Sequence, residues 1–170
     1  MGQTKLEQHA QEIVPGLWLG GQWACRYARE AGFGTICVLE NPCAQGCSHA
    51  PILAVGSGGI LNDRETQLVK EEYGRLIRCA PHLLKTAHLV IDEFLKTGQV
   101  LVHCLAGRER SPLVVATWLC ERHGVTLDEA YGLIISKRPV VERRAFWLSD
   151  AERDRRIRED QGDGPEHGKT

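Results

Sequence analysis

The chain has 170 residues, of which 42% are hydrophobic and 25% charged, so it is long enough for one domain with a buried core. Its formal net charge of −1 excludes the strongly basic surface of proteins that bind nucleic acid through counterion release. We therefore expect one domain over residues 1–150, no nucleic-acid partner, and any anion site to be local.

The sequence carries no pattern typical of export or membrane insertion. Residues 1–20 lack a basic start followed by a continuous apolar run, and no apolar run approaches the roughly 20 residues of a membrane span. The seven cysteines are an odd number, which does not suit a complete set of disulfides. We therefore expect a cytoplasmic monomer without stable membrane insertion.

Short apolar runs alternate with helical patterns along the chain. In chain order the pattern predicts a helix over 22–32, a strand within 32–40, a mostly loop-like segment over 41–59 with one short strand near 52–55, a helix over 81–98, and a strand within 98–104. Buried strands that alternate with helices predict an α/β fold, with a central, mostly parallel sheet flanked by helices on both faces.

Two more helices and a tail complete the predicted order. The first helix covers 112–124, where Pro112 suits the first helical position. The second covers 126–138, where Thr126 and Glu129 have the spacing of a capping box. Residues 151–170 are nearly all charged or helix-breaking, so we expect a frayed or disordered C-terminal tail.

Cys104 stands where a predicted buried strand ends and a short loop leads into a helix. Backbone N–H groups of residues 105–110 and the positive end of the next helix can form a cradle for phosphate oxygens. Arg110 adds a guanidinium that can bind two of those oxygens in a fork. Because such surroundings also lower the pKa of a thiol, we expect Cys104 to be a nucleophile.

We expect the neighbours of Cys104 to take part in the same reaction. We expect Ser111 to donate a hydrogen bond to the sulfur when it leaves, and His103 to orient the loop rather than transfer a proton. The expected phosphate-binding residues are Leu105, Ala106, Gly107, Arg108, Glu109 and Arg110. The predicted reaction is in-line attack on phosphorus, then hydrolysis of a cysteinyl-phosphate by water, with no metal and no cofactor.

Three segments resemble the dual-specificity branch of the cysteine-dependent protein phosphatases. They are IVPGLWLG (13–20), VLVHCLAGRERS (100–111) and SKRPVV (136–141). The resemblance implies a protein-tyrosine-phosphatase-like fold, with Cys104 as nucleophile, Arg110 as the phosphate-binding arginine and Ser111 as the hydroxyl that helps to break the intermediate. It also implies phosphorylated protein substrates, carrying phosphotyrosine, phosphoserine or phosphothreonine.

The family also uses an upstream aspartate that protonates the leaving oxygen. Asp63, which follows a short apolar run and precedes a helical pattern, is the acid we expect. It lies farther from Cys104 than the family's usual spacing, which falls instead near Glu71 or Glu72 inside a predicted helix. A weakened or absent acid is the remaining alternative, and Asp92 lies too close to the catalytic strand.

Other functions stay open at this stage. Arg108 favours a more anionic phosphoinositide or a small phosphate ester, but Glu109 offsets its charge. Arg138, Arg143 and Arg144 form either a basic rim near the pocket or a solvated face. A misplaced acid would leave a phosphate-binding adaptor without turnover, and a sulfur-transfer enzyme is a further alternative that the Arg-Ser pair disfavours.

The remaining cysteines receive structural or redox interpretations. We expect Cys25, Cys37, Cys79 and Cys120 to be small buried apolar residues. Cys43 and Cys47, with His49 close by, form one spaced pair, and a single pair is weak evidence for zinc. A cysteine near Cys104 that traps it in a reversible disulfide is the better-supported interpretation.

Overall fold

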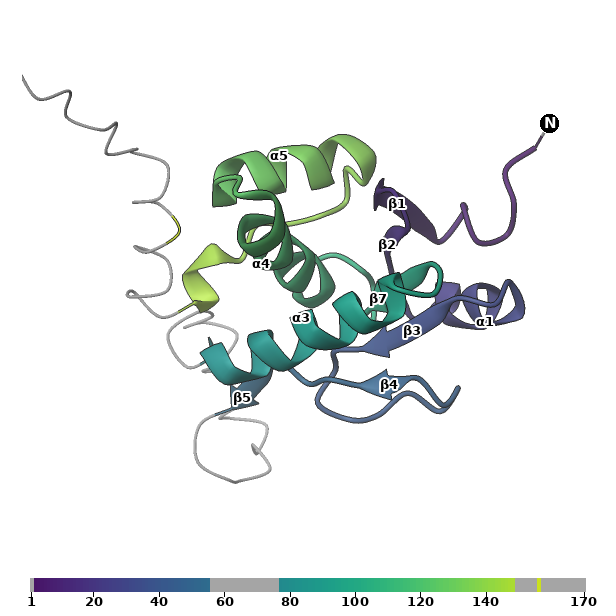
Figure 1. Cartoon of the computed structure of the whole chain (residues 1–170), viewed down its shortest axis with the longest axis horizontal. Coiled ribbons are helices and arrows are strands. Elements are labelled where there is room, and N and C mark those ends of the chain that lie inside the picture. Colours follow the sequence, from purple (N-terminus) through teal and green to yellow (C-terminus); the bar gives the residue numbers. More distant parts are fainter. Residues whose placement is uncertain (1, 56–76, 149–155, 157–170) are drawn as a thin grey trace, which may run out of the picture.

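The computed structural model describes residues 2–55, 77–148 and 156 (Figure 1). Its strands are β1 (Ala10–Val14), β2 (Leu17–Gly20), β3 (Gly34–Cys37), β4 (Ser48–His49), β5 (Leu53–Val55), β6 (Ile77–Cys79) and β7 (Val100–His103). Its helices are α1 (Gln22–Glu30), α3 (Pro81–Leu95), α4 (Arg110–His123) and α5 (Leu127–Lys137), with a 3₁₀ turn, η2 (Ala145–Trp147).

The main sheet has the strand order β1-β2-β7-β3-β4. Strands β2, β7, β3 and β4 are parallel, and β1 is antiparallel to β2. Strand β7 is central, and its last residue, His103, pairs with Gly20 on one side and Cys37 on the other. The prediction of a mostly parallel central sheet is confirmed, and the antiparallel β1 makes the sheet a mixed one.

Successive residues of β7 point to opposite faces of the sheet, as they must in any strand. Val100 and Val102 pack in the large core that includes α3, α4 and α5, whereas Leu101 packs in a smaller core with α1. The alternation continues past the strand end. Cys104 therefore joins the large core, while the ring of His103 contacts Cys47, which packs against the smaller core.

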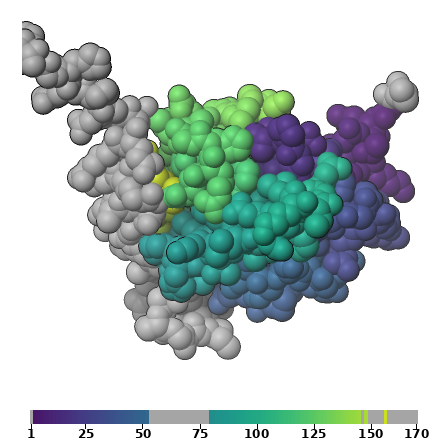
Figure 2. Space-filling model, viewed as in Figure 1, coloured from purple at the N-terminus to yellow at the C-terminus, as the bar shows by residue number. Residues whose placement is uncertain are grey.

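Helices cover both faces, as predicted. Helix α1 packs on β2, β3 and β7 from one side, and α3 and α4 pack on the other. Figure 2 shows the side chains of α3 (teal) running across the front of the molecule, with those of α5 (light green) above them. Residues 111–120 of α4 are all buried, which explains why this helix reads as an almost continuous apolar run.

The predicted helices over 22–32, 81–98 and 126–138 are confirmed, each somewhat shorter at its C-terminal end. The Thr126–Glu129 capping box is present. Helix α4, however, begins at Arg110 rather than Pro112. Pro112 still lies in the first turn, where its missing N–H would have no helical partner.

The segment 41–59, which the structure describes as far as residue 55, is less loop-like there than expected. Strand β5 confirms the strand near 52–55, but β4 was missed, because two residues are too few to show an alternating pattern. In the predicted tail the structure describes Arg156 alone, whose buried guanidinium lies 2.7 Å from Glu121 on α4. Among the described residues, no helix has both the length and the apolar character required to cross a membrane.

Candidate active site

A pocket of about 280 Å³ lies over the loop that joins β7 to α4. It is lined by Cys104, Leu105, Ala106, Arg108, Glu109, Arg110 and Glu142. The side chain of Cys104 is only 3% exposed. Arg110 reaches the same pocket and has no ion-pair partner among the described residues. The structure thus brings together most of the residues expected to bind phosphate around one nearly buried thiol.

The sulfur of Cys104 lies among hydrogen-bonding groups. Its Sγ is 3.2 Å from Ser111 Oγ, and the backbone N–H of Gly107 donates to it at 3.3 Å. The Ser111 hydroxyl also lies 3.3 Å from the carbonyl oxygen of Gly20 and donates to it. A hydroxyl has one hydrogen. Ser111 therefore donates to Gly20 when it accepts from the Cys104 thiol, and can turn to donate to the thiolate.

Opposing influences act on the pKa of Cys104. Burial is the largest and raises the pKa, because a charged sulfur loses its hydration. The Ser111 hydroxyl, the backbone N–H groups of Ser111 and Gly107, and then the positive charge of Arg110 all lower it. The second group prevails, and the pKa of Cys104 lies below that of an ordinary thiol.

The loop is held with its carbonyl groups turned outward. The carbonyls of residues 105–108 accept, in order, from Gln22 N–H at 2.9 Å, Arg138 Nη2 at 3.0 Å, Arg138 Nε at 2.8 Å and Glu142 N–H at 2.8 Å. Because neighbouring peptide N–H and C=O groups point in roughly opposite directions, this pattern leaves the N–H groups for the pocket side. Arg138 is therefore a loop-bracing residue, which the sequence analysis missed.

Glycines let β2 and the loop approach each other closely. Gly107 has a φ of +64°, and a Cβ there would lie 2.5 Å from the carbonyl carbon of Gly20. A Cβ on Gly21 would lie 2.8 Å from the carbonyl oxygen of Leu105. Backbone packing between β2 and the loop thus requires glycine at positions 107 and 21, whereas a Cβ on Gly20 would lie 2.7 Å from the carbonyl oxygen of His9.

The arginines of the 136–144 region are used within the protein. Arg108 pairs with Glu142 at 2.5 Å, and Arg144 pairs with Glu109 at 2.6 Å and also with Glu142. Neither a basic rim nor a solvated face describes Arg138 and Arg144, so both expectations are corrected for these two. Arg143 lies at the surface and pairs with Asp128 at 2.7 Å.

Of the four residues considered as the general acid, the structure describes Asp92 alone. Asp63, Glu71 and Glu72 lie outside the described residues. Asp92 accepts from Trp118 Nε1 at 2.8 Å and pairs with Arg122 at 2.6 Å. Its carboxylate thus joins α3 to α4.

His103 contacts the loop through its backbone. Its Nδ1 lies 3.1 Å from the carbonyl oxygen of Cys104, which can only accept, so Nδ1 carries the hydrogen. Its Nε2 lies 3.2 Å from Cys47 Sγ, on the α1 side of the sheet. The ring of His103 therefore joins the nucleophile's backbone to a second group of thiols.

The second group of thiols contains a contact that the sequence did not predict. Cys25 is buried as predicted, and its Sγ also lies 2.9 Å from that of Cys47. The hydrogen bond from Cys25 lowers the pKa of Cys47, burial opposes this, and the contact with the His103 ring lowers the pKa further. His49 is not in the group, since its Nε2 donates to the carbonyl of Leu39 at 2.7 Å. Cys37, Cys79 and Cys120 are buried as predicted.

Sequence comparisons point to one family. The family described as dual specificity phosphatase, catalytic domain, matches residues 63–154. Dual specificity protein phosphatase 12 of Mus musculus is 30% identical over 136 residues, which make up 77% of this chain and 37% of that protein. Dual specificity protein phosphatase 1 of Arabidopsis thaliana is 42% identical over 59 residues, or 34% of this chain and 30% of that protein. The alignments thus span about a third of each of these relatives.

Solved structures share the fold. Human DUSP28 superposes with a TM-score of 0.59 at 20% identity, covering 90% of this chain and 95% of that one. A mouse dual specificity phosphatase gives a TM-score of 0.60 at 21% identity, covering 95% of this chain and 92% of that one. The likeness extends over nearly the whole of both chains and confirms the predicted phosphatase-like fold.

Proposed function

The chain belongs to the dual specificity phosphatase family, and on that premise we propose that it removes phosphate from phosphotyrosine and from phosphoserine or phosphothreonine in proteins through a cysteinyl-phosphate intermediate. One observation carries the proposal. A nearly buried thiol with a lowered pKa lies at a pocket whose loop turns its carbonyl groups away. This is a site for an anion next to a nucleophile.

In the first step the Cys104 thiolate attacks phosphorus and the bond to the substrate oxygen breaks. Three groups stabilise the phosphoryl oxygens: the N–H groups of residues 105–109, the positive end of α4, and the guanidinium of Arg110. Arg110 lines the pocket and has no ion-pair partner in the part of the chain that the structure describes, which supports this role. The departing oxygen takes a proton from an acid, for which we propose Asp63, the first residue of the family match.

In the second step water attacks the same phosphorus and the sulfur leaves as a thiolate. The leaving sulfur gains negative charge as the bond breaks. The Ser111 hydroxyl stabilises this charge by turning its hydrogen from the Gly20 carbonyl to the sulfur. The distances from Ser111 Oγ, 3.3 Å to the Gly20 oxygen and 3.2 Å to Cys104 Sγ, support this movement. His103 orients the loop through its hydrogen bond to the Cys104 carbonyl and transfers no proton.

The charges around the pocket favour a singly phosphorylated protein side chain. Arg108 is neutralised by Glu142, and Glu109 by Arg144, so among the described residues that line the pocket Arg110 is the cation without an ion-pair partner. A headgroup with several phosphates would need further unpaired cations. The phosphoinositide alternative is therefore the weaker one. An adaptor would bind the phosphorylated protein without hydrolysing it, so an assay of hydrolysis distinguishes it from an enzyme.

The test is hydrolysis of an aryl phosphate and of matched phosphotyrosine and phosphothreonine peptides between pH 5 and 8. We expect activity in the parent, loss in Cys104→Ser and Arg110→Lys, and disappearance of the alkaline limb of the pH profile in Asp63→Asn. Cys120→Ser, which changes a buried thiol of α4 away from the loop, is the matched control. A parent that binds phosphopeptide through Arg110 but does not hydrolyse it would replace the enzyme by an adaptor.

A further inference from the structure

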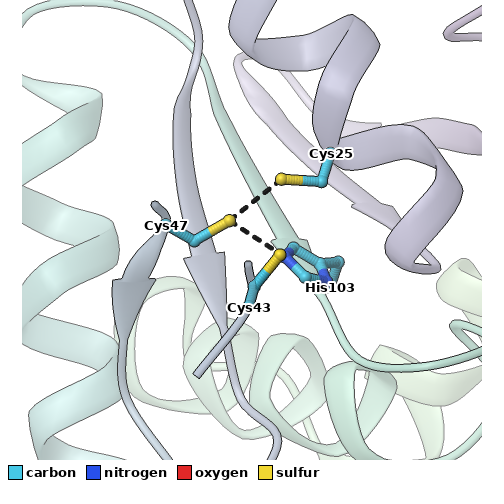
Figure 3. Close-up of side chains that lie close together, drawn as sticks. All are labelled: Cys25, Cys43, Cys47 and His103. Atoms are coloured by element: carbon cyan, nitrogen blue, oxygen red, sulfur yellow. Dashed lines mark hydrogen bonds between the residues drawn. The ribbon is translucent and has the colours of Figure 1, made fainter. Parts of the chain in front are cut away.

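Four metal-ligating side chains converge on the α1 side of the sheet, behind the catalytic loop (Figure 3). Cys25 comes from α1, Cys43 and Cys47 from the segment between β3 and β4, and His103 from the end of β7. Their three sulfur atoms and the imidazole nitrogen all lie within 4.8 Å of one another. These donors are separate from the residues that line the Cys104 pocket.

We propose that these four residues bind one zinc ion as a tetrahedral three-cysteine, one-histidine site. Soft thiolates with one imidazole are the ligand set that zinc prefers in structural sites. Bonds of about 2.3 Å to a central zinc place tetrahedral ligand atoms about 3.8 Å apart. Two of the separations, 2.9 Å for Cys25 to Cys47 and 3.2 Å for Cys47 to His103, are shorter than this value, and all pairs lie within 4.8 Å. Small side-chain movements would therefore bring the four donors to the spacing that zinc requires.

The hydrogen bonds of His103 suit a zinc ligand. Its Nδ1–H donates to the Cys104 carbonyl, which fixes the ring orientation and leaves the Nε2 lone pair directed toward the three sulfurs. Histidines that bind zinc use their second nitrogen in this way in most known sites. The expectation that His103 orients the catalytic loop and the zinc proposal are therefore compatible, because each uses a different ring nitrogen.

The segment that carries Cys43 and Cys47 is shaped for two ligands. The backbone N–H of Gln45 donates to Cys43 Sγ at 3.4 Å, a contact that favours a thiolate. Gly46 has a φ of +76°, and its carbonyl accepts from Arg29 at 2.9 Å, so the turn is tied to α1, which carries Cys25. A pocket of about 540 Å³, lined in part by Cys43 and His103, gives an ion a route from solvent.

Zinc accounts for the group better than a disulfide does. A Cys25–Cys47 disulfide would use two of the four donors and leave Cys43 and the imidazole without a shared purpose. A zinc ion uses all four. It would also join α1, the 43–47 turn and the end of β7, so its expected effect is to hold the backbone of Cys104 in place. This departs from the expectation that no residue binds a metal, and the phosphoryl-transfer steps above do not pass through the ion.

The test is the zinc content of the full chain purified under reducing conditions, together with titration of the metal-stripped protein by cobalt. We expect one zinc per chain, and the visible spectrum of tetrahedral cobalt with thiolate ligands. Cys43→Ser and Cys47→Ser should weaken zinc binding by at least about 100-fold. Cys43→His should restore it, and Cys37→Ser, a buried thiol outside the group, should leave it unchanged.

Several results would overturn the proposal. One is a parent chain that holds no zinc and takes up no tetrahedral cobalt. Another is zinc that persists in Cys43→Ser and Cys47→Ser. A third is a metal-free parent with a Cys25–Cys47 disulfide in its peptide map, which would make the group a redox pair. If a serine variant does not fold, the cobalt spectrum of the parent decides, and since none of these readouts is phosphatase activity, the two proposals fail separately.

Discussion

Two thiol environments lie on opposite sides of the end of β7, and they differ in what surrounds the sulfur. The sulfur of Cys104 contacts the Ser111 hydroxyl and the Gly107 backbone N–H, and Arg110 lines the pocket beside it. Cys25 and Cys47 face each other, with Cys43 and the His103 ring close by. Hydrogen-bond donors and an open pocket surround the first sulfur, whereas each sulfur of the second group has the other three metal-ligating atoms within 4.8 Å.

The difference shows how one strand end serves two kinds of chemistry. Donors around a lone sulfur stabilise a thiolate that is ready to attack an anion held beside it. Sulfur and imidazole nitrogen atoms that converge on one point can each give a lone pair to a cation placed between them. Because His103 and Cys104 are adjacent and point to opposite faces, the strand's alternation alone assigns one residue to each environment.

The largest expected effect is on the nucleophile. Cys104→Ser should lower kcat/KM for an aryl phosphate by more than about a thousandfold, since an alcohol at this site is a far weaker nucleophile than a thiolate. Steady-state kinetics measure it, with Cys47→Ser assayed alongside. Equal losses in the two variants would erase the distinction between the environments.

His88 sharpens the comparison, because its surroundings disfavour charge whereas those of Cys104 favour it. Burial between α3 and α4, then the charges of Arg156 and Arg122, lower the pKa of His88 to about 4. Its Nε2–H donates to Thr117 Oγ1 at 2.9 Å. The unfolded chain takes up this proton at higher pH than the folded one. The contribution of His88 to folding stability is therefore complete above about pH 6.5, and about 3 kcal/mol of it is lost as pH falls toward 4.

Denaturant unfolding between pH 7 and 4 measures this loss. His88→Leu should flatten the pH dependence in that window, whereas His82→Asn, an exposed change on the same helix, should keep it. An unchanged slope in His88→Leu would assign acid sensitivity to other groups.

The bracing of the loop provides a third test. Arg138→Ala removes the donors to the Ala106 and Gly107 carbonyls and should lower kcat by about 100-fold, because small displacements of groups that bind the transition state cost that much. Arg143→Ala, which removes a surface ion pair with Asp128, is the matched control and should keep its rate. Similar kinetics in the two variants would show that the loop holds its shape without Arg138.

Ser111→Ala should have the smallest of these effects on rate, about 10- to 100-fold in kcat, the size expected for one hydrogen bond to a charged group. The Ser111 hydroxyl helps to lower the pKa of Cys104, so its loss raises that pKa. Since the thiolate is the reactive form, the acid limb of the kcat/KM profile should move to higher pH. Ser136→Ala on α5 is the control. If the acid limb of Ser111→Ala does not move, Ser111 does not stabilise the thiolate.

The catalytic loop was predictable because its parts are contiguous. A short stretch of sequence contains, in order, the strand, Cys104, Gly107, Arg110 and the helix. The local sequence pattern was therefore enough to predict their arrangement. The bracing by Arg138 was not predictable, because its donors reach the loop only once α5 has packed beside it. Nothing in the sequence indicates that the Arg138 guanidinium donates hydrogen bonds to backbone carbonyls.

The cluster of Cys25, Cys43, Cys47 and His103 was not predictable for a similar reason. Cys43 and Cys47 are a recognisable pair in the sequence, but the neighbouring His49 forms a hydrogen bond with the carbonyl of Leu39 instead of joining them. The partners that complete the group come from α1 and β7, and they meet the pair only through the packing of α1 on the sheet. Strand β4 was overlooked because two residues carry no periodicity.

The central claim is that Cys104 carries the phosphoryl group during the reaction, and trapping that group tests it most directly. Ser111→Ala should slow the departure of the sulfur, so rapid acid quenching of this variant during turnover should preserve the intermediate for peptide mass spectrometry. We expect one added phosphoryl group on the peptide that contains Cys104, and none after Cys104→Ser. A phosphoryl group on another residue, or none at all while product is being formed, would contradict the account.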